Sequence, residues 1–177
     1  MKMKNVSRAA VAAAVLAAGS TAAVTSAAPT HSAATPKITA AGVGKVKLDK
    51  SYRRLRAQGL VGKIGPGCEA AGPKARSAKL KAPLTGSVDF TLNKPRKVAN
   101  ITVRGGATAR GVGIGSTIGQ IKAKFPTAET DHSAESTFGV TIVRIPAPGD
   151  KVKFQFAVST KTHKTTEVGI PDIQFCD

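Results

Sequence analysis

The sequence predicts an α+β fold of two tandem repeats, each with one short helix and about three antiparallel strands, packed together. Three observations predict it. Apolar residues recur at helical spacing twice, near 48–55 and 114–125. Segments in which apolar and polar residues alternate, as in strands, follow each helix. A shift of 66 residues brings the two apolar patterns into register. Each unit alone is near the lower size limit for a core, so we expect the two to share one.

Residues 1–27 are typical of a secretory signal peptide. Three basic residues precede an uncharged apolar run over 9–18, which is too short to span a bilayer. Small side chains surround the expected cleavage after Ala27. We therefore expect a secreted, extracellular protein without a transmembrane segment in its mature part.

An Ala-, Thr- and Pro-rich stretch comes next, and we expect it to be a flexible linker over 28–43. After removal of the leader, 24 Lys and Arg remain against 10 Asp and Glu, a net charge of +14. Such a charge favours acidic proteins or polyanions such as wall polymers as partners. The alternative is a basic surface that serves only solubility.

The repeats are predicted at 44–109 and 110–177. A shift of 66 aligns the two helices and one strand, and a shift of 67 aligns the next strand. The aligned pairs are Leu48/Ile114, Tyr52/Ile118, Leu55/Ile121, Val88/Phe154, Phe90/Phe156, Leu92/Val158, Ile101/Val168 and Val103/Ile170.

Each repeat opens with the helix. In the second repeat, Thr117 and Gln120 fit a capping box, in which each side chain satisfies a backbone N–H of the first turn, and Pro126 stops the helix. In the first repeat, Gly59 ends it.

Strands with period-2 alternation follow each helix, as in an antiparallel meander with one buried face. The turns between them carry Pro, Asn or Gly. The predicted strands are 78–82, 88–92 and 99–103 in the first repeat, and 138–145, 151–158 and 166–170 in the second.

Cys68 and Cys176 are the only cysteines. In an exported protein an even count favours a disulfide, which here would join the two repeats. The chain-entropy model gives a loop of roughly 100 residues about 4–5 kcal/mol of stabilisation. A reactive thiol is the alternative, with His132 and His163 as the candidate activating imidazoles.

Catalytic patterns are weak. The loop 111–115 could cradle an anion, but a tight entry to a capped helix explains it better. Asp131-His132-Ser133 does not fit a triad, because adjacent residues on an extended chain point apart. No metal-binding spacing occurs, and the ten acids of the mature chain are scattered. We expect no cofactor, and a hydrolase is disfavoured.

Specific binding of nucleic acid is also disfavoured. The chain has no Trp, and the core patterns use most of its Phe residues, so stacking platforms are lacking. The predicted working surface is instead the solvent face of the sheet, with Lys79, Lys81, Thr102 and Arg104 in the first repeat and Lys151, Lys153 and Gln155 in the second.

The stretch 114–121, which continues to Phe125-Pro126, resembles a short motif of outer-membrane assembly lipoproteins of the SmpA/OmlA type. The tandem helix-plus-sheet arrangement also resembles the beta-lactamase inhibitory protein family. These resemblances imply a non-catalytic module whose exposed sheet face meets a protein partner. The chain departs from both patterns, since it lacks the lipoprotein cysteine and one cysteine pair per repeat. It is also similar to uncharacterised exported proteins of high-GC bacteria, which implies no function.

We therefore expect a monomeric, secreted, non-enzymatic protein that binds an acidic protein partner through its basic sheet face. The alternative is an envelope-associated protein that binds polyanions through diffuse positive charge.

Overall fold

The structure, a computed structural model, describes residues 34–149 and 151–175, which form an α+β fold of antiparallel strands and short helices. We divide this part of the chain after residue 105 into a first and a second half. The first half contains β1 (Ile38–Thr39), β2 (Gly42–Val43), β3 (Val46–Lys47), α1 (Tyr52–Ala57), β4 (Gly65–Pro66), the 3-10 turn η1 (Glu69–Ala71), β5 (Arg76–Lys79), β6 (Thr85–Phe90) and β7 (Val98–Gly105). The second half contains β8 (Thr108–Ala109), β9 (Val112–Gly113), α2 (Ile118–Lys124), β10 (Glu129–Asp131), α3 (Glu135–Phe138), β11 (Val140–Ala147), β12 (Lys151–Ser159) and β13 (Thr165–Ile170).

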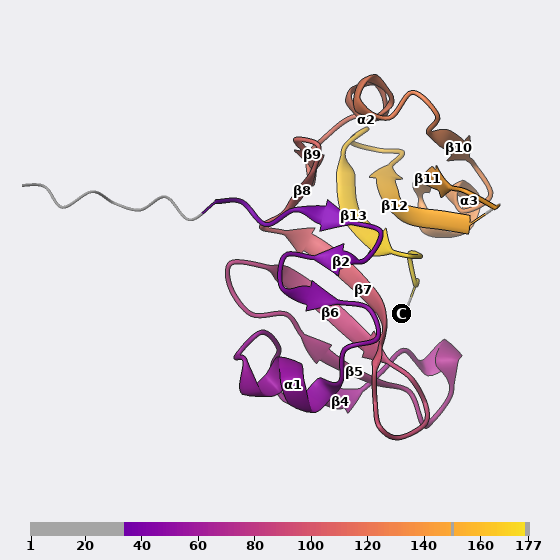
Figure 1. Ribbon diagram of the computed structural model, residues 1–177. Helices are drawn as coiled ribbons and strands as arrows, with labels where there is room; N and C mark the ends of the chain where they lie inside the picture. Colours follow the sequence, from indigo (N-terminus) through magenta and orange to yellow (C-terminus); the bar gives the residue numbers. More distant parts are fainter. Residues whose placement is uncertain (1–33, 150, 176–177) are drawn as a thin grey trace, which may run out of the picture. The chain divides into compact units, whose positions relative to one another are not determined.

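Eight strands form one antiparallel sheet in the order β10-β11-β12-β13-β7-β6-β5-β4. The last strands of the two halves, β7 and β13, lie side by side at its centre (Figure 1). Two small ladders, β1-β2-β3 and β8-β9, are separate from this sheet. A parallel bridge between Lys37 and Thr108 joins them to each other.

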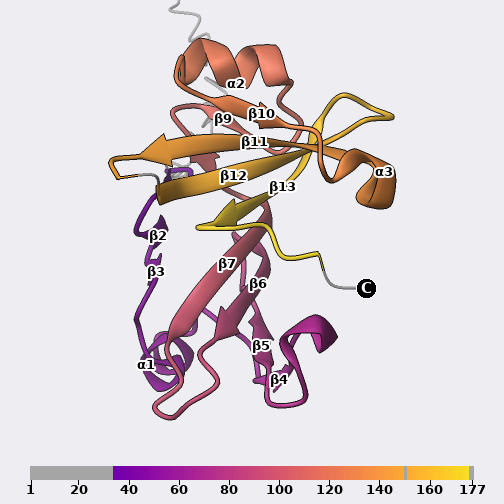
Figure 2. The ribbon, with the colours of Figure 1, turned by 90° about the vertical axis from the view of Figure 1, so that its right-hand side faces the viewer.

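One face of the sheet carries the main core. Ile101 from β7 and Phe156 from β12 are fully buried on this face. Leu55 from α1 and Ile121 from α2 belong to the same cluster, together with residues of the small ladders. Figure 2 shows α1 near β5 and β7, and α2 near β9 and β10. The two helices and the ladders therefore cover one face of the sheet.

The opposite face carries polar side chains, and the segment 171–175 crosses it. The backbone N–H of Asp172 donates to Oδ1 of Asn100 at 3.2 Å, and Nε2 of Gln155 donates to Oδ1 of Asp172 at 3.3 Å. A Cβ on Gly169 would lie 2.1 Å from the carbonyl oxygen of Asp172. Only a glycine at position 169 therefore allows this segment to approach so closely.

The predicted capping box of the second helix is confirmed. The Thr117 hydroxyl accepts from the backbone N–H of Gln120 at 3.3 Å, and Oε1 of Gln120 accepts from the backbone N–H of Thr117 at 2.9 Å. The helix ends at Lys124, with Phe125 as its C-cap and Pro126 behind it.

Both helices begin later than the apolar spacing predicts, because Leu48 and Ile114 lie in turns before the caps. The residues that follow them, Asp49 and Gly115, have φ of 61° and 83°. A residue with positive φ cannot continue into a right-handed helix, so each helix starts only after its N-cap, which is Ser51 in α1.

The strands are displaced from the predicted ranges by up to three residues at most ends. In the first half, β6 ends at Phe90, so Leu92 is 50% exposed rather than buried. In the second half, residues 135–138 form α3, so β11 begins at Val140 rather than at 138. The alternation of apolar residues identified each long strand but did not fix its ends.

The two halves contain similar elements in the same order: a small ladder of three strands in the first half and two in the second, a helix, a short strand, a helical turn and three longer strands. The strand order of one half mirrors that of the other about the central pair, where Thr102 faces Gly169. The N-caps Ser51 and Thr117 lie 66 positions apart.

The sequence boundaries need one correction. Residues 38–43 were expected in the linker, but they form β1 and β2, and Ile38 and Val43 are buried in the core. Apolar packing thus begins before residue 44. The predicted boundary between the repeats, after residue 109, falls in the turn between β8 and β9. The leader, 1–27, lies outside the described residues.

Candidate functional site

The predicted solvent face of the sheet is not open at its centre. Thr102 and Gln155, expected to be exposed, retain only 3% and 9% of their accessible surface. The segment 171–175 covers this region, and its backbone N–H at Ile173 donates to Oε1 of Gln155 at 3.3 Å. Both residues therefore contact the chain itself, so the prediction of an exposed surface was wrong for them.

The charge of this face is also partly neutralised. The guanidinium of Arg104 donates to Oε2 of Glu167 at 3.0–3.1 Å across β7 and β13. Lys79 is exposed on β5, and Lys81 is exposed in the turn that follows that strand. Of the predicted first-half residues, only these two lysines remain as exposed cations outside an ion pair between described residues.

Lys153 belongs to a different surface. The ladder between β11 and β12 pairs Ile145 with Phe154 but Pro146 with Val152, so Lys153 is the extra residue of a β-bulge. A bulge redirects the side chain of the extra residue. Lys153 accordingly lines a hollow on the core side of the sheet, together with Phe154. Lys151 is part of β12, and its side chain lies outside the described set.

The Asp131-His132-Ser133 segment has a structural role. Asp131 accepts from the backbone N–H of Ser133 at 2.9 Å and pairs with Arg144. The Ser133 hydrogen bonds hold the pKa of Asp131 below its ordinary value. Nδ1 of His132 lies 2.6 Å from Oε1 of Glu135, so this imidazole contacts a helix carboxylate rather than a nucleophile.

His163, the second candidate activating imidazole, is exposed in the turn after β12, with φ of 55°. In the described ranges, no group of three or more His, Cys, Asp or Glu residues could hold a metal ion.

Cys68 lies beside the end of the described chain. Its Sγ is 3.9 Å from the carbonyl oxygen of Phe175, and the ring of Phe175 stacks on that of Phe138 with centroids 4.1 Å apart. Cys176, the second cysteine of the predicted disulfide, lies outside the described residues. The described chain therefore ends beside Cys68.

A group of exposed cations lies on α1 and on the segments beside it. Tyr52 at its start donates its backbone N–H to Arg96 O at 2.9 Å, and in the loop behind it Gly62 donates its backbone N–H to Lys79 O at 2.8 Å. These bonds place the start of β7 and the end of β5 beside the helix. We call the resulting cluster the α1 basic surface. Its exposed members are Arg53, Arg54 and Arg56 on the helix and Lys63, Lys79, Lys81 and Lys97 on the loop and strand ends beside it. Lys79 alternates with the buried Ala78 and Leu80, so its side chain lies on the face of β5 that α1 does not cover.

The two halves differ sharply in charge. Residues 28–105 carry 16 Lys and Arg against 3 Asp and Glu, a net charge of +13, whereas residues 106–177 carry 8 against 7, a net charge of +1. Of the first-half cations, only Arg104 forms an ion pair within the described chain. Charge summed over the whole mature chain does not reveal this surface. A count by half would have found it.

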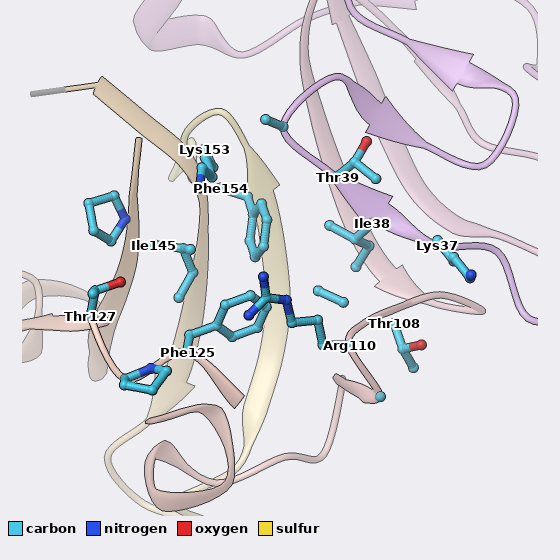
Figure 3. Close-up of a pocket in the computed structure, with 15 residues that line it drawn as sticks. Lys37, Ile38, Thr39, Thr108, Arg110, Phe125, Thr127, Ile145, Lys153 and Phe154 are labelled. Atoms are coloured by element: carbon cyan, nitrogen blue, oxygen red, sulfur yellow. The ribbon is translucent and has the colours of Figure 1, made fainter. Parts of the chain in front are cut away.

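A hollow of about 650 Å³ lies between β1, β8, the end of α2, and the adjoining ends of β11 and β12 (Figure 3). Ile38, Phe125, Ile145 and Phe154 provide apolar walls, and each is less than a tenth exposed. The rings of Phe125 and Phe154 meet edge to face, with centroids 5.6 Å apart.

Three cations lie in the lining of this hollow. Lys37, Arg110 and Lys153 line it, and the lining contains no acidic residue. The Arg110 guanidinium carbon lies 5.0 Å from the centroid of the Phe125 ring, and Nη1 donates to Lys124 O at 3.2 Å. A cation at a helix C-terminus is favourable, so α2 helps to hold Arg110 in place.

Comparison of the chain with protein-family models, with curated proteins and with solved structures finds no match. Across the described ranges, no helix is both long enough and apolar enough to cross a bilayer.

Proposed function

We propose that this chain is a secreted, non-enzymatic binding protein whose first half engages an acidic protein partner through the α1 basic surface. The observation that carries the proposal is the charge difference between the halves, +13 against +1. A solubility role alone gives no reason to place almost all of the excess charge in one half. Clustered cations raise the association rate of acidic partners and exclude basic ones.

The geometry around α1 supports this location. Arg53, Arg54 and Arg56 are exposed on a single short helix. Because neighbouring charges of one sign repel each other, their proximity costs stability in the free protein. An acidic partner relieves this repulsion on binding, which favours the complex.

We further propose that the chain arose by duplication of one unit. The shared order of elements, the mirrored strand order and the N-caps 66 positions apart support it. Under this proposal one copy kept a nearly neutral surface with paired charges, and the other acquired the α1 basic surface.

A disulfide between Cys68 and Cys176 is part of the proposal. The 3.9 Å approach of Cys68 Sγ to the carbonyl oxygen of Phe175, the residue before Cys176, supports it. The bond would fix the segment 171–175 over the polar sheet face. Intact-mass spectrometry tests it: without a reductant the mature protein should be two hydrogens lighter than after reduction, and two free thiols would refute it.

The second candidate function is an envelope-associated polyanion binder that uses charge without a defined surface. The mature net charge of +14 favours it. Its binding would fall steeply with salt and would depend on the number of cations rather than on their position.

Two matched triple variants separate the candidates. Arg53→Gln with Arg54→Gln and Arg56→Gln removes three charges from α1, whereas Lys122→Gln with Lys124→Gln and Lys161→Gln removes three exposed charges from the second half. In capture from culture supernatant at low ionic strength, the first triple variant should lose an acidic protein that the second retains. Equal loss in both variants would favour diffuse charge, and retention by both would refute the α1 basic surface.

A further inference from the structure

The hollow of Figure 3 is separate from the α1 basic surface and has a different chemical character. Its volume of about 650 Å³ lies within the range of about 300–1,000 Å³ that is typical of sites for small organic ligands. It is much larger than a single side chain would need. This volume therefore indicates a small molecule as the occupant rather than one anchoring residue of a protein.

The lining is divided by polarity. Phe125, Ile145 and Phe154 form an apolar wall that can cover the body of a ligand. Arg110 and Lys153 approach it from two different elements, the β8–β9 turn and the β12 bulge. A ligand that satisfies both parts has an apolar body and an anionic end.

Arg110 is held ready for such an anion. Its contact with the Phe125 ring and its hydrogen bond to Lys124 O fix the guanidinium beside the aromatic wall (Figure 3). The Lys124 bond is the only hydrogen bond its guanidinium makes to the described residues, and a guanidinium has five N–H donors. A carboxylate accepts two of these donors side by side, which matches their planar geometry.

We propose that this hollow binds an amphipathic carboxylate, a compound with an aromatic or branched apolar body and one carboxylate. The carboxylate accepts hydrogen bonds from Arg110 and attracts the ammonium group of Lys153. The apolar body packs against Phe125 and Phe154. This inference is independent of the acidic protein partner, because none of the α1 basic surface residues lines the hollow.

The probe for the test is 4-phenylbutyrate, followed by amide chemical shifts in the full mature protein. We expect saturable shifts at residues 108–111, at Phe125, at Thr127 and at Lys153. The alcohol 4-phenylbutan-1-ol keeps the body without the charge, and acetate keeps the charge without the body. Both should bind at least about tenfold more weakly, because each lacks one half of the contact.

Three single variants complete the test. Arg110→Gln and, separately, Lys153→Gln should each weaken 4-phenylbutyrate about tenfold, while Lys161→Gln, an exposed lysine outside the hollow, should leave it unchanged. Lys153→Gln keeps the test valid if Arg110→Gln lowers stability. The proposal is overturned if the alcohol binds as tightly as the acid, if both hollow variants bind like wild type, or if no saturable shift occurs up to about 10 mM.

Discussion

The two halves of the molecule use similar elements for different surfaces. In the first half, acids are scarce, and cations cluster unpaired around α1. In the second half, acids nearly equal cations, Asp131 and Glu167 each lie in an ion pair, and Glu135 contacts the His132 ring. The packing side of the two helices is alike, because Leu55 and Ile121 occupy matching buried positions. The core thus constrains both halves in the same way, whereas the surface is free to differ.

The largest expected effects test whether the packing is equivalent. Leu55→Ala and Ile121→Ala each remove a fully buried side chain and should each cost about 2–4 kcal/mol of unfolding free energy. Urea denaturation of the two variants measures this. If one substitution is tolerated while the other unfolds the protein, the helices do not play matching roles.

The next largest effect on stability is expected at the central strand pair, where Thr102 of β7 faces Gly169 of β13. These two residues differ in their surroundings. Gly169→Ala would place a Cβ 2.1 Å from the carbonyl oxygen of Asp172 and should cost about 1–3 kcal/mol. Hydrogen exchange at Ile173 should accelerate in this variant as the segment 171–175 lifts. Thr102→Ala adds no atoms, and it should leave that exchange close to wild type.

Acidification should lower the stability contributed by carboxyl groups of the second half and raise that contributed by a carboxyl group of the first half. Hydrogen bonds lower the pKa of Asp131 and of Glu135, chiefly from Ser133 and from Thr141 respectively. The stability that these two carboxylates contribute is present at a pH above their pKa values in the unfolded chain. It is lost as the pH falls through their pKa values in the folded protein. Burial raises the pKa of Asp89 in the first half, so its protonation on acidification is favourable.

Thermal unfolding between about pH 7 and pH 3 can detect this difference. The pair Asp131→Asn and Glu135→Gln should flatten the acid loss of stability. Asp89→Asn should remove the small gain of stability on acidification and leave the loss of stability that comes from Asp131 and Glu135. An unchanged pH profile in the pair would mean that these carboxylates do not support the second half.

The smallest effect concerns the turns before the helices. Gly115→Ala should cost about 1 kcal/mol, because φ is 83° there and an added Cβ would meet only open space. Asp49→Gly at the matching position should change stability by less than about 0.5 kcal/mol, because aspartate tolerates positive φ. A large loss on Asp49→Gly would show that the Asp49 side chain makes a contact that the turn needs.

The sequence predicted the parts of the fold that depend on local patterns. The capping box at Thr117 followed from two side chains at fixed spacing, and the long strands followed from alternation. The sequence alignment of the two repeats was wrong by two residues in one strand. It matched Val88 with Phe154 and Ile101 with Val168. In the structure Val88 faces Ile101 across β6 and β7, but Phe156, not Phe154, faces Val168 across β12 and β13. A shift of two residues keeps every side chain on its face, so alternation cannot detect it.

The candidate site was harder to predict for three physical reasons. Alternation shows that Thr102 and Gln155 share a face but not that the segment 171–175 covers it. The bulge that redirects Lys153 has no marker in the local pattern. The hollow depends on β1 and β12, which are far apart in the sequence, so only the folded chain brings its lining together.

The first half, and not the second, is expected to meet the acidic protein partner. The most direct measurement is a titration of the ¹⁵N-labelled mature protein with poly-L-glutamate at low ionic strength, followed by amide chemical shifts. We predict changes concentrated at residues 50–63, 79–81 and 96–98. Changes of similar size at Lys122, Lys124 and Lys161 would contradict it.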